Sequence, residues 1–446
     1  MRVVREVRLP LRRVLRLHRI YATMQVTRFD VLSVLRESRY RNLFTAQVVA
    51  LLGTGLLTVA LGLLAYDIAG ADAGAVLGTA LTIKMVAYVG VAPVIAALVN
   101  RLPRKAVLIG ADVIRLAVAI SLPFLTDIWQ IYLLVFILQS ASATFTPAFQ
   151  SLIPVVLPNE RDYTKALSLS RLAYDLEALV SPLLAAALLS VIEFNLLFVG
   201  TAVGFALSAV LVLVTPFPSR TPVTTTGSVW HRTTLGARIF ARTPSLRFLM
   251  AMNLVVGAGT ALVLVNTVVY ARDVFQFDNS SLGFALACYG AGSLLVAINV
   301  PRLVERFGDR RLMLTGATVS SLALIGAVGM TAWATSAAGG GAWWLLLPLW
   351  LLIGAGNSMI STPSARLLAR ASDDNTRNYI YTAQFSLSHA CFLITYPLAG
   401  WIGAASLTVA AAVLAVIAIV AGLIASRGWR SPTNTPKSIE QEKMVS

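Results

Sequence analysis

The sequence has only two cysteines and three histidines among its 446 residues. Cys288 and Cys391 both lie inside apolar runs, where buried free thiols are commoner than metal ligands. No group of histidines and cysteines has the spacing of a dedicated metal site. The composition therefore indicates neither a disulfide framework nor a resident metal centre.

Charge is also scarce, because 13% of the residues are Asp, Glu, Lys or Arg whereas 57% are hydrophobic. The mean hydropathy of +0.77 lies outside the range of soluble proteins, so the sequence predicts a polytopic membrane protein. The formal net charge is +16, but the basic residues form short clusters between apolar runs. We therefore expect lipid headgroups, and not nucleic acid, as their partners.

Signatures of catalysis are missing as well. The chain contains no Walker loop, no paired-glycine dinucleotide motif and no segment long enough for a soluble ATPase domain. We expect no enzyme activity and no cofactor, and any transport would be driven by an ion gradient or by the gradient of the substrate.

Long apolar runs make up most of the chain, and they predict an all-α protein of about twelve transmembrane helices in two six-helix pseudo-repeats. The expected spans are 43–66, 75–99, 106–124, 128–152, 165–190, 194–215, 247–270, 281–304, 311–334, 342–365, 377–401 and 404–425. The expected divisions are a basic N-terminal segment 1–42, a first bundle 43–215, a linker 216–246, a second bundle 247–425 and a tail 426–446.

The loops that carry Lys and Arg alternate with loops that carry none, and Arg272 is the clear exception. The positive-inside rule places both termini and the linker in the cytoplasm. We expect the chain to lie in a bacterial inner membrane. Within 1–42, arginines recur at i+3 and i+4 spacing, which predicts a basic amphipathic helix on an anionic membrane surface. Alternatively, translation begins at Met24 instead of Met1.

One apolar segment, 163–186, carries charge near its middle. At about 1.5 Å rise per residue, Asp175 and Glu177 lie roughly 15 to 20 Å deep in a bilayer about 30 Å thick, which marks a functional site. Asp175 follows Arg171 by one helical turn and can form a neutralising structural pair. Glu177 points almost the opposite way, on a face with Tyr174 and hydroxyl side chains, so we expect it to line a cavity.

The two halves of the sequence repeat each other. NRLPRK (100–105) lies between spans 2 and 3, and ERFGDRR (305–311) lies between spans 8 and 9. Thr146-Pro147 in the first half corresponds to Thr362-Pro363 in the second. Duplicated halves predict a transporter whose site lies at the interface between the repeats.

These features resemble the major facilitator superfamily. Its loop motif between spans 2 and 3 is matched by Glu305, Arg306, Gly308, Arg310 and Arg311, and in degraded form by Asn100, Arg101, Pro103, Arg104 and Lys105. The resemblance implies that these loops take part in conformational switching. The span-4 arginine of the family is absent, and its span-5 Gly-Pro motif is reduced to Ser181-Pro182.

Several stretches of the first half, such as YTKALSLSRLAYDLEALVSP (163–182), are similar to bacterial nickel and cobalt resistance exporters, relatives of the drug-efflux branch. The tail lacks the His-rich sequence of some of these exporters. The resemblance implies a central cavity lined by spans 1, 2, 4, 5, 7, 8, 10 and 11. The polar residues expected there are Gln139, Gln150, Asn357 and Gln384.

Two further residues have alternative roles. Lys84 can neutralise an acid such as Asp67, or act as a gate that a cation or proton displaces. His389 can be a packed, hydrogen-bonded side chain, or it can bind the transported metal together with Glu177. Asp112 and Arg115 have the i, i+3 spacing of a structural ion pair.

Together these features predict a monomeric secondary exporter of nickel or cobalt that works by proton antiport and alternating access. The alternative is efflux of a drug, a macrolide or a siderophore-like organic molecule. A membrane receptor with a transporter-like body is the third possibility, although the chain lacks a long signalling domain.

Overall fold

The computed structural model describes residues 32–91, 103–217, 238–335, 341–371 and 377–428, and these residues form helices and short connections without a strand. The helices of the first half are α2 (Ser38–Ala69), α3 (Ala73–Val86), α5 (Arg104–Ser121), α6 (Ile128–Val156), α7 (Glu160–Leu189) and α8 (Asn195–Val214). Those of the second half are α10 (Pro244–Val269), α11 (Asn279–Ala334), α12 (Ala342–Arg370), α13 (Arg377–Pro397) and α15 (Leu407–Gly428). Shorter turns are η1 (Leu32–Arg36), η2 (Gly70–Asp72), η3 (Ala87–Val91), η4 (Leu122–Phe124), η5 (Tyr270–Val274), η7 (Leu398–Ile402) and α14 (Gly403–Ala405).

The 56-residue helix α11 corresponds to two of the expected spans, because its backbone leaves helical geometry at Gly308, where φ is 76°. Division at this kink brings the long helical segments of the described chain to twelve. Length and composition select ten membrane-crossing candidates among the described residues. The difference arises because α2 and α3 are counted together as Ser38–Gly90, and because α7 is not among the candidates.

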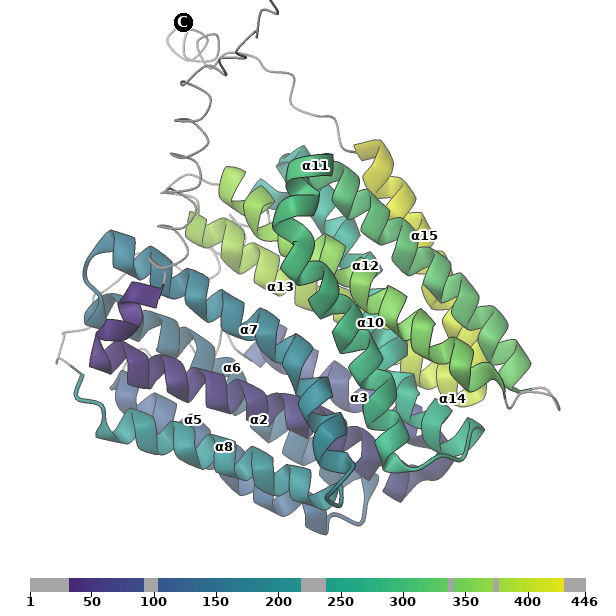
Figure 1. The fold of residues 1–446 in the computed structure, drawn as a ribbon. Helices are drawn as coiled ribbons and strands as arrows, with labels where there is room; N and C mark the ends of the chain where they lie inside the picture. Colours follow the sequence, from purple (N-terminus) through teal and green to yellow (C-terminus); the bar gives the residue numbers. More distant parts are fainter. Residues whose placement is uncertain (1–31, 92–102, 218–237, 336–340, 372–376, 429–446) are drawn as a thin grey trace, which may run out of the picture.

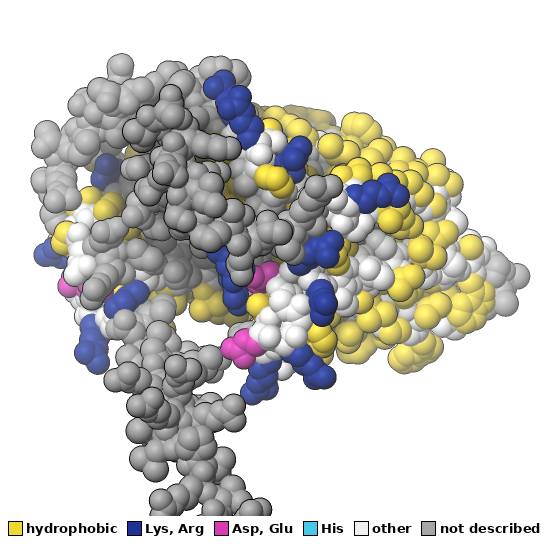
Figure 2. Space-filling view, turned by 90° about the horizontal axis from the view of Figure 1, so that it is seen from above, with side chains coloured by type: hydrophobic (Ala, Val, Ile, Leu, Met, Phe, Trp, Pro, Cys, Tyr) yellow, Lys and Arg dark blue, Asp and Glu magenta, His cyan; other side chains and the backbone are white. Residues whose placement is uncertain are grey.

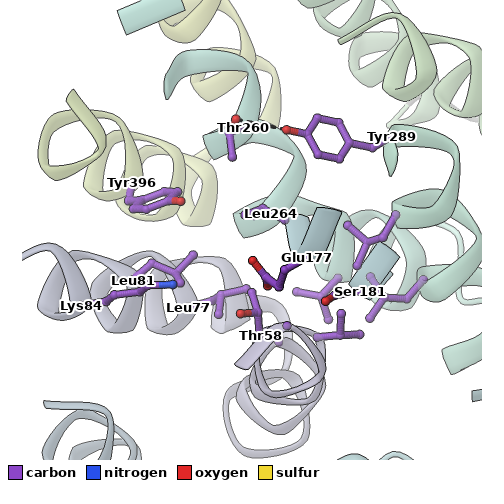
Figure 3. Close-up of a pocket in the computed structure, with 16 residues that line it drawn as sticks. Thr58, Leu77, Leu81, Lys84, Glu177, Ser181, Thr260, Leu264, Tyr289 and Tyr396 are labelled. Atoms are coloured by element: carbon purple, nitrogen blue, oxygen red, sulfur yellow. Dashed lines mark hydrogen bonds between the residues drawn. The ribbon is translucent and has the colours of Figure 1, made fainter. Parts of the chain in front are cut away.

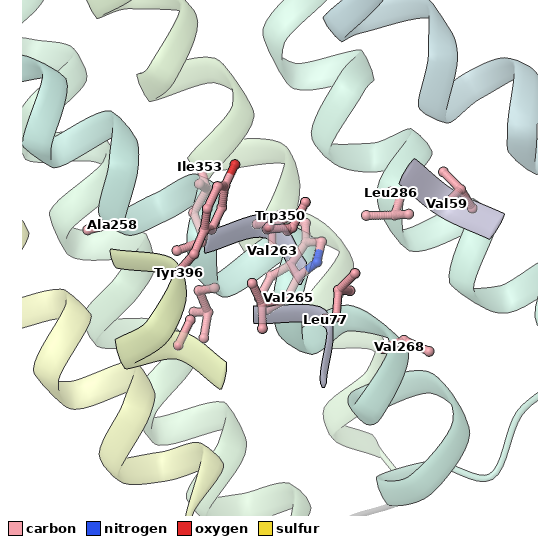
Figure 4. Packing of buried hydrophobic residues seen from close by; sticks show 14 of the residues in the cluster. Val59, Leu77, Ala258, Val263, Val265, Val268, Leu286, Trp350, Ile353 and Tyr396 are labelled. Atoms are coloured by element: carbon pink, nitrogen blue, oxygen red, sulfur yellow. The ribbon is translucent and has the colours of Figure 1, made fainter. Parts of the chain in front are cut away.

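The helices of the two halves form two groups that lie side by side (Figure 1). The largest hydrophobic cluster spans both groups, and it contains Val59 and Leu77 of the first half together with Val268 and Leu286 of the second (Figure 4). Two smaller clusters each belong to one half: one contains Tyr40, Phe149 and Ile153, and the other contains Val296, Val300 and Leu312. Among the described residues, the halves therefore share their hydrophobic core at one end of the molecule.

Glycine contacts join the halves at this shared end, which we call the closed end and define by Gly78, Gly283 and Gly400. A Cβ atom at Gly78 would lie 2.8 Å from the carbonyl oxygen of Tyr396 and 2.9 Å from Gly400 Cα. One at Gly283 would lie 2.6 Å from Ala186 Cα. Only glycine allows the backbones of α3 and η7, and of α7 and α11, to approach this closely.

The opposite end carries the basic loops, and we call it the basic end (Figure 2). Lys105 Nζ donates hydrogen bonds to the carbonyl oxygens of Leu213 and Thr215 at 2.7 and 3.0 Å, where α8 ends. Arg310 Nη2 donates in the same way to the carbonyl oxygen of Ser426 in the last turn of α15. Cations from equivalent loops thus stabilise the C-terminal ends of equivalent helices in the two halves.

Asp112 and Arg115 form the ion pair that their spacing predicts, and both side chains are buried. Ser208 Oγ donates a hydrogen bond to Asp112 Oδ2 at 2.7 Å. The guanidinium group lies 4.4 Å and 4.6 Å from the ring centroids of Phe145 and Phe205. The pair therefore ties α5 to α8 and packs against α6 inside the first half.

Candidate functional site

A cavity of about 200 Å³ lies between the two halves, and its walls come from α2, α3, α7, α10, α11 and α13. Most of the wall is aliphatic, with side chains such as Leu77, Leu81 and Leu264. Two charged groups, Glu177 and Lys84, and several hydroxyl groups interrupt it (Figure 3). The cavity therefore combines the apolar lining and the few convergent polar groups typical of a site for a small molecule.

Glu177 enters the cavity from α7, with Ser181 one helical turn further along the same helix. Gly55 of α2 packs against both, and a Cβ atom there would lie 2.8 Å from Glu177 Oε1. The absence of a side chain at Gly55 thus leaves room for the carboxylate. The structure places Glu177 where its helical face predicts, towards the interface of the repeats.

Lys84 reaches the same cavity from α3, whereas Glu177 reaches it from α7; both helices belong to the first half (Figure 3). No ion pair shorter than 4.0 Å joins it to Glu177 within the described part of the chain. Two opposite charges that share an apolar cavity attract each other strongly, because little water screens them. Of the two alternatives for Lys84, the pairing with Asp67 is not observed, since Asp67 is exposed near the end of α2.

A hydroxyl cluster forms part of the wall contributed by the second half. Asn357 Nδ2 donates hydrogen bonds to Thr260 Oγ1 at 3.1 Å and to the Tyr289 hydroxyl at 3.3 Å. Those two hydroxyl groups lie 3.3 Å apart and both line the cavity. Ser320 Oγ donates to Asn357 Oδ1 at 3.3 Å from behind. Asn357 itself is buried behind the wall, one layer away from the cavity.

The other polar residues expected in the cavity do not line it. The Tyr174 hydroxyl is hydrogen-bonded to Thr146 Oγ1 at 3.0 Å, which joins α7 to α6. Gln384 exchanges two 3.3 Å hydrogen bonds with Asn253 and so joins α13 to α10. Gln139 is buried in α6, and Gln150 is exposed near the end of that helix. A polar stripe on a helix therefore did not distinguish cavity lining from helix-to-helix bonding.

His389 lies on α13 apart from this cavity. Its Nδ1–H donates to the carbonyl oxygen of Phe385 at 2.6 Å. Its ring lies 4.1 Å from the ring of Phe385 and 5.4 Å from that of Tyr88 on η3, measured between centroids. The described residues contain no group of three or more His, Cys, Asp or Glu side chains placed to hold a metal ion. The geometry of His389 matches its packed, hydrogen-bonded alternative.

The side chains of Arg171 and Asp175 lie outside the described residues, so their expected pair stays a prediction. Arg101 and Asn100 of the first loop, and the basic segment 1–31, also lie outside. In the second loop, Glu305, Arg306 and Arg311 are exposed, and the guanidinium group of Arg306 lies 5.3 Å from the ring centroid of Phe307.

Asp309 was not predicted as a site residue, although it lies within the segment ERFGDRR (305–311). Its carboxylate is 7% exposed, accepts a hydrogen bond from Arg370 at 2.7 Å and lies 3.5 Å from Arg366. Thr260, Tyr289 and Tyr396 were missed in the cavity. Single hydroxyl residues inside apolar spans carry no signal of their own, and only the face of each helix could have indicated them.

Residues 43–280 and 249–445 match the Major Facilitator Superfamily. The chain therefore belongs to this superfamily: it is a multi-pass membrane transporter and not an enzyme.

Macrolide efflux protein A of Streptococcus pyogenes is 27% identical over 185 residues, which is 40% of this chain and 45% of that protein. The protein of the same name from Enterococcus faecalis is 30% identical over 152 residues, 32% of this chain and 47% of that protein. An uncharacterised transporter of Bacillus subtilis, YfiS, is 25% identical over 214 residues, 46% of this chain and 50% of that protein. The chain thus matches about half of the length of these relatives.

Solved structures agree in fold. The nucleoside transporter NupG (D323A mutant) has a TM-score of 0.66 at 14% identity, with 88% of this chain and all of that chain covered. A bacterial homologue of the human lysosomal transporter Spinster, solved in an inward-facing conformation, has a TM-score of 0.64 at 13% identity, with 89% and 99% covered. At such identities the similarity establishes the fold alone.

Proposed function

We propose that this transporter exports amphipathic organic molecules from a bacterial cell by proton antiport. The observation that carries the proposal is the apolar cavity with a carboxylate, Glu177, between the halves. A carboxylate there can hold a proton or a basic group of the cargo in turn, which links the two movements. The names of the relatives from Streptococcus pyogenes and Enterococcus faecalis favour organic cargo and the outward direction.

Nickel or cobalt export has less support. Lys84 shares the cavity with Glu177 and repels a divalent cation more strongly than a singly charged amine. His389 does not line that cavity, so it is not placed to bind an ion together with Glu177. The metals therefore serve as comparison cargo in the experiment and not as the proposed substrate.

Alternating access fits the arrangement of the halves. The glycine contacts around Gly78 and Gly283 close one end of the interface, whereas the smaller hydrophobic clusters remain separate. With the basic end in the cytoplasm, as the positive-inside rule favours, this is the state that faces the cytoplasm. Export then requires the two groups of helices to rock about the cavity until the closed end separates.

Transport into inverted bacterial membrane vesicles tests the function. A macrolide, ethidium, nickel and cobalt are offered separately, with and without an imposed proton gradient. We expect gradient-dependent accumulation of at least one organic compound, and its loss in Glu177→Gln. Asp67→Asn, which removes an exposed acid near the closed end, is the matched control and should transport normally. Accumulation of the metals alone, or full transport by Glu177→Gln, would contradict the proposal.

A further inference from the structure

We propose that the cavity binds its cargo at two poles, and that Asn357 is the positioning residue of the second. At the first pole Glu177 binds a basic nitrogen. At the second, the hydroxyl pair of Thr260 and Tyr289 donates a hydrogen bond to an oxygen acceptor of the same molecule. The inference rests on the proposed function and narrows its substrate class to amphipathic amines that carry a carbonyl, ether or hydroxyl oxygen.

The hydroxyl pair can donate one hydrogen bond to cargo. The two hydrogens of the Asn357 amide are directed at Thr260 Oγ1 and the Tyr289 hydroxyl, so both oxygens already accept one hydrogen bond. Each hydroxyl has one hydrogen of its own, and the 3.3 Å contact between them uses one of the two. One O–H therefore remains at the cavity wall, and an acceptor on the cargo satisfies it.

Asn357 is buried behind the cavity wall, so it can affect cargo only through Thr260 and Tyr289. Its side chain is 4% exposed, and Ser320, which donates to its oxygen, is fully buried. A Cβ atom at Gly259 would lie 3.3 Å from Asn357 Oδ1, so the amide is packed closely on that side. Cargo does not reach Asn357, but the amide sets the direction of the hydroxyl hydrogens that cargo meets.

An apolar part of the cavity wall lies between the two poles. Thr260, Leu264 and Val268 follow one another by a helical turn along α10, and all three line the cavity. Leu264 therefore lies between the hydroxyl pair and the region of Glu177 (Figure 3). A molecule that meets both poles must carry its amine and its acceptor on either side of an apolar body, because Leu264 offers no polar contact in between.

The experiment compares two probes in the same vesicles. A macrolide carries an amine and several oxygen acceptors, whereas ethidium is an organic cation without an oxygen acceptor. The test variant Tyr289→Phe/Thr260→Val removes both hydroxyls at nearly constant shape, because either hydroxyl alone would still keep one free hydrogen. Asn357→Leu removes the positioning amide. Ser358→Ala is the control, because Ser358 lies next to Asn357 on α12 but pairs with Thr362.

We expect each test variant to raise the KM for the macrolide about three- to tenfold, with Vmax retained, as loss of one hydrogen bond predicts. The ratio of macrolide to ethidium transport should fall at least threefold, and Ser358→Ala should keep the wild-type ratio. A fall in Vmax with unchanged KM, equal losses for both probes, or wild-type kinetics in both test variants would overturn the two-pole assignment. If ethidium is not transported, the test rests on the macrolide alone: a raised KM with retained Vmax supports the second pole, and any other result overturns it.

Failure of the proposed function looks different. A wild-type protein that transports neither probe overturns both proposals. If macrolide export depends on Glu177 but is unchanged by Tyr289→Phe/Thr260→Val, the proposed function stands and only the second pole is lost.

Discussion

Asp309 accepts a hydrogen bond from Arg370 at 2.7 Å, and this contact joins the kink of α11 to the last turn of α12. The carboxylate is buried, whereas Arg366 and Arg370 are 49% and 63% exposed. Removal of the acid returns two arginines to water, but removal of the arginines leaves a carboxylate buried without its partners. The two losses are therefore unequal.

We expect the double variant Arg366→Ala/Arg370→Ala to lower the melting temperature of the purified protein more than Asp309→Asn does. Thermal unfolding in detergent measures the difference. Asp309→Asn should cost about 1 kcal/mol or less, as for a partly exposed ion pair. A larger loss from Asp309→Asn would show that the carboxylate has a role beyond neutralising the arginines.

Gly308→Ala should destabilise the protein by about 1 to 3 kcal/mol, because Gly308 has a φ of 76° and a ψ of 158°, a backbone region essentially restricted to glycine. Gly329→Ala is the matched control in the same helix. A Cβ atom would meet nothing within 4 Å at either position, but only Gly308 has a positive φ. Equal melting temperatures of the two variants would contradict the backbone explanation.

Asp112→Asn should destabilise the first half by about 3 to 5 kcal/mol, since it leaves the Arg115 guanidinium buried between two phenyl rings without a counter-ion. The control is Asp162→Asn, which removes the 3.5 Å pair with Lys165 from a partly exposed position. Expression level and melting temperature measure both. Similar losses in the two variants would argue against a special role of the buried pair.

Gly78→Ala should shift the transporter away from the state with a closed end, because the new methyl group meets the backbone of Tyr396 and Gly400. In a variant without native cysteines, Thr58→Cys in the cavity wall reports this opening. A membrane-impermeant thiol reagent, applied from the closed-end side, should label it several-fold faster with Gly78→Ala than without. Gly62→Ala, whose Cβ would make an ordinary 3.5 Å contact with Leu77, should leave labelling unchanged.

The cap of α11 predicts a dependence on pH. Hydrogen bonds from Ser281 and Ser280 lower the pKa of Asp278 below its ordinary value of 3.8. A carboxyl whose pKa is lower in the folded state stabilises the protein above the unfolded pKa, and this contribution disappears as the pH falls through the folded value. Wild-type protein should therefore melt above Asp278→Ala at pH 7, and the gap should narrow under strongly acidic conditions. A gap that is constant with pH would exclude the charge as its cause.

The helical spacing of polar residues predicted the position of Glu177 but not the positions of Gln384 and Asn357. Helical spacing separated Glu177 from Asp175, and the structure places Glu177 in the cavity. The same reasoning grouped Gln384 and Asn357 with the lining residues, because a stripe of polar residues gives a direction but no neighbour. Gln384 pairs with Asn253, and Asn357 stands one layer behind Tyr289. The partners come from helices more than 60 residues away in the chain.

The sequence by itself determined the class of protein, the number of helices and the basic loops. Each of these depends on the hydropathy or charge of one segment, which decides on its own whether that segment crosses the bilayer or stays in water. Only the tertiary structure decided which polar groups share a cavity. That choice depends on how six helices from two halves pack, and close backbone contacts such as Gly78 with Gly400 set their rotation and depth. A buried polar group takes its role from the partner that packing brings to it, as the contrast between Glu177 and His389 shows.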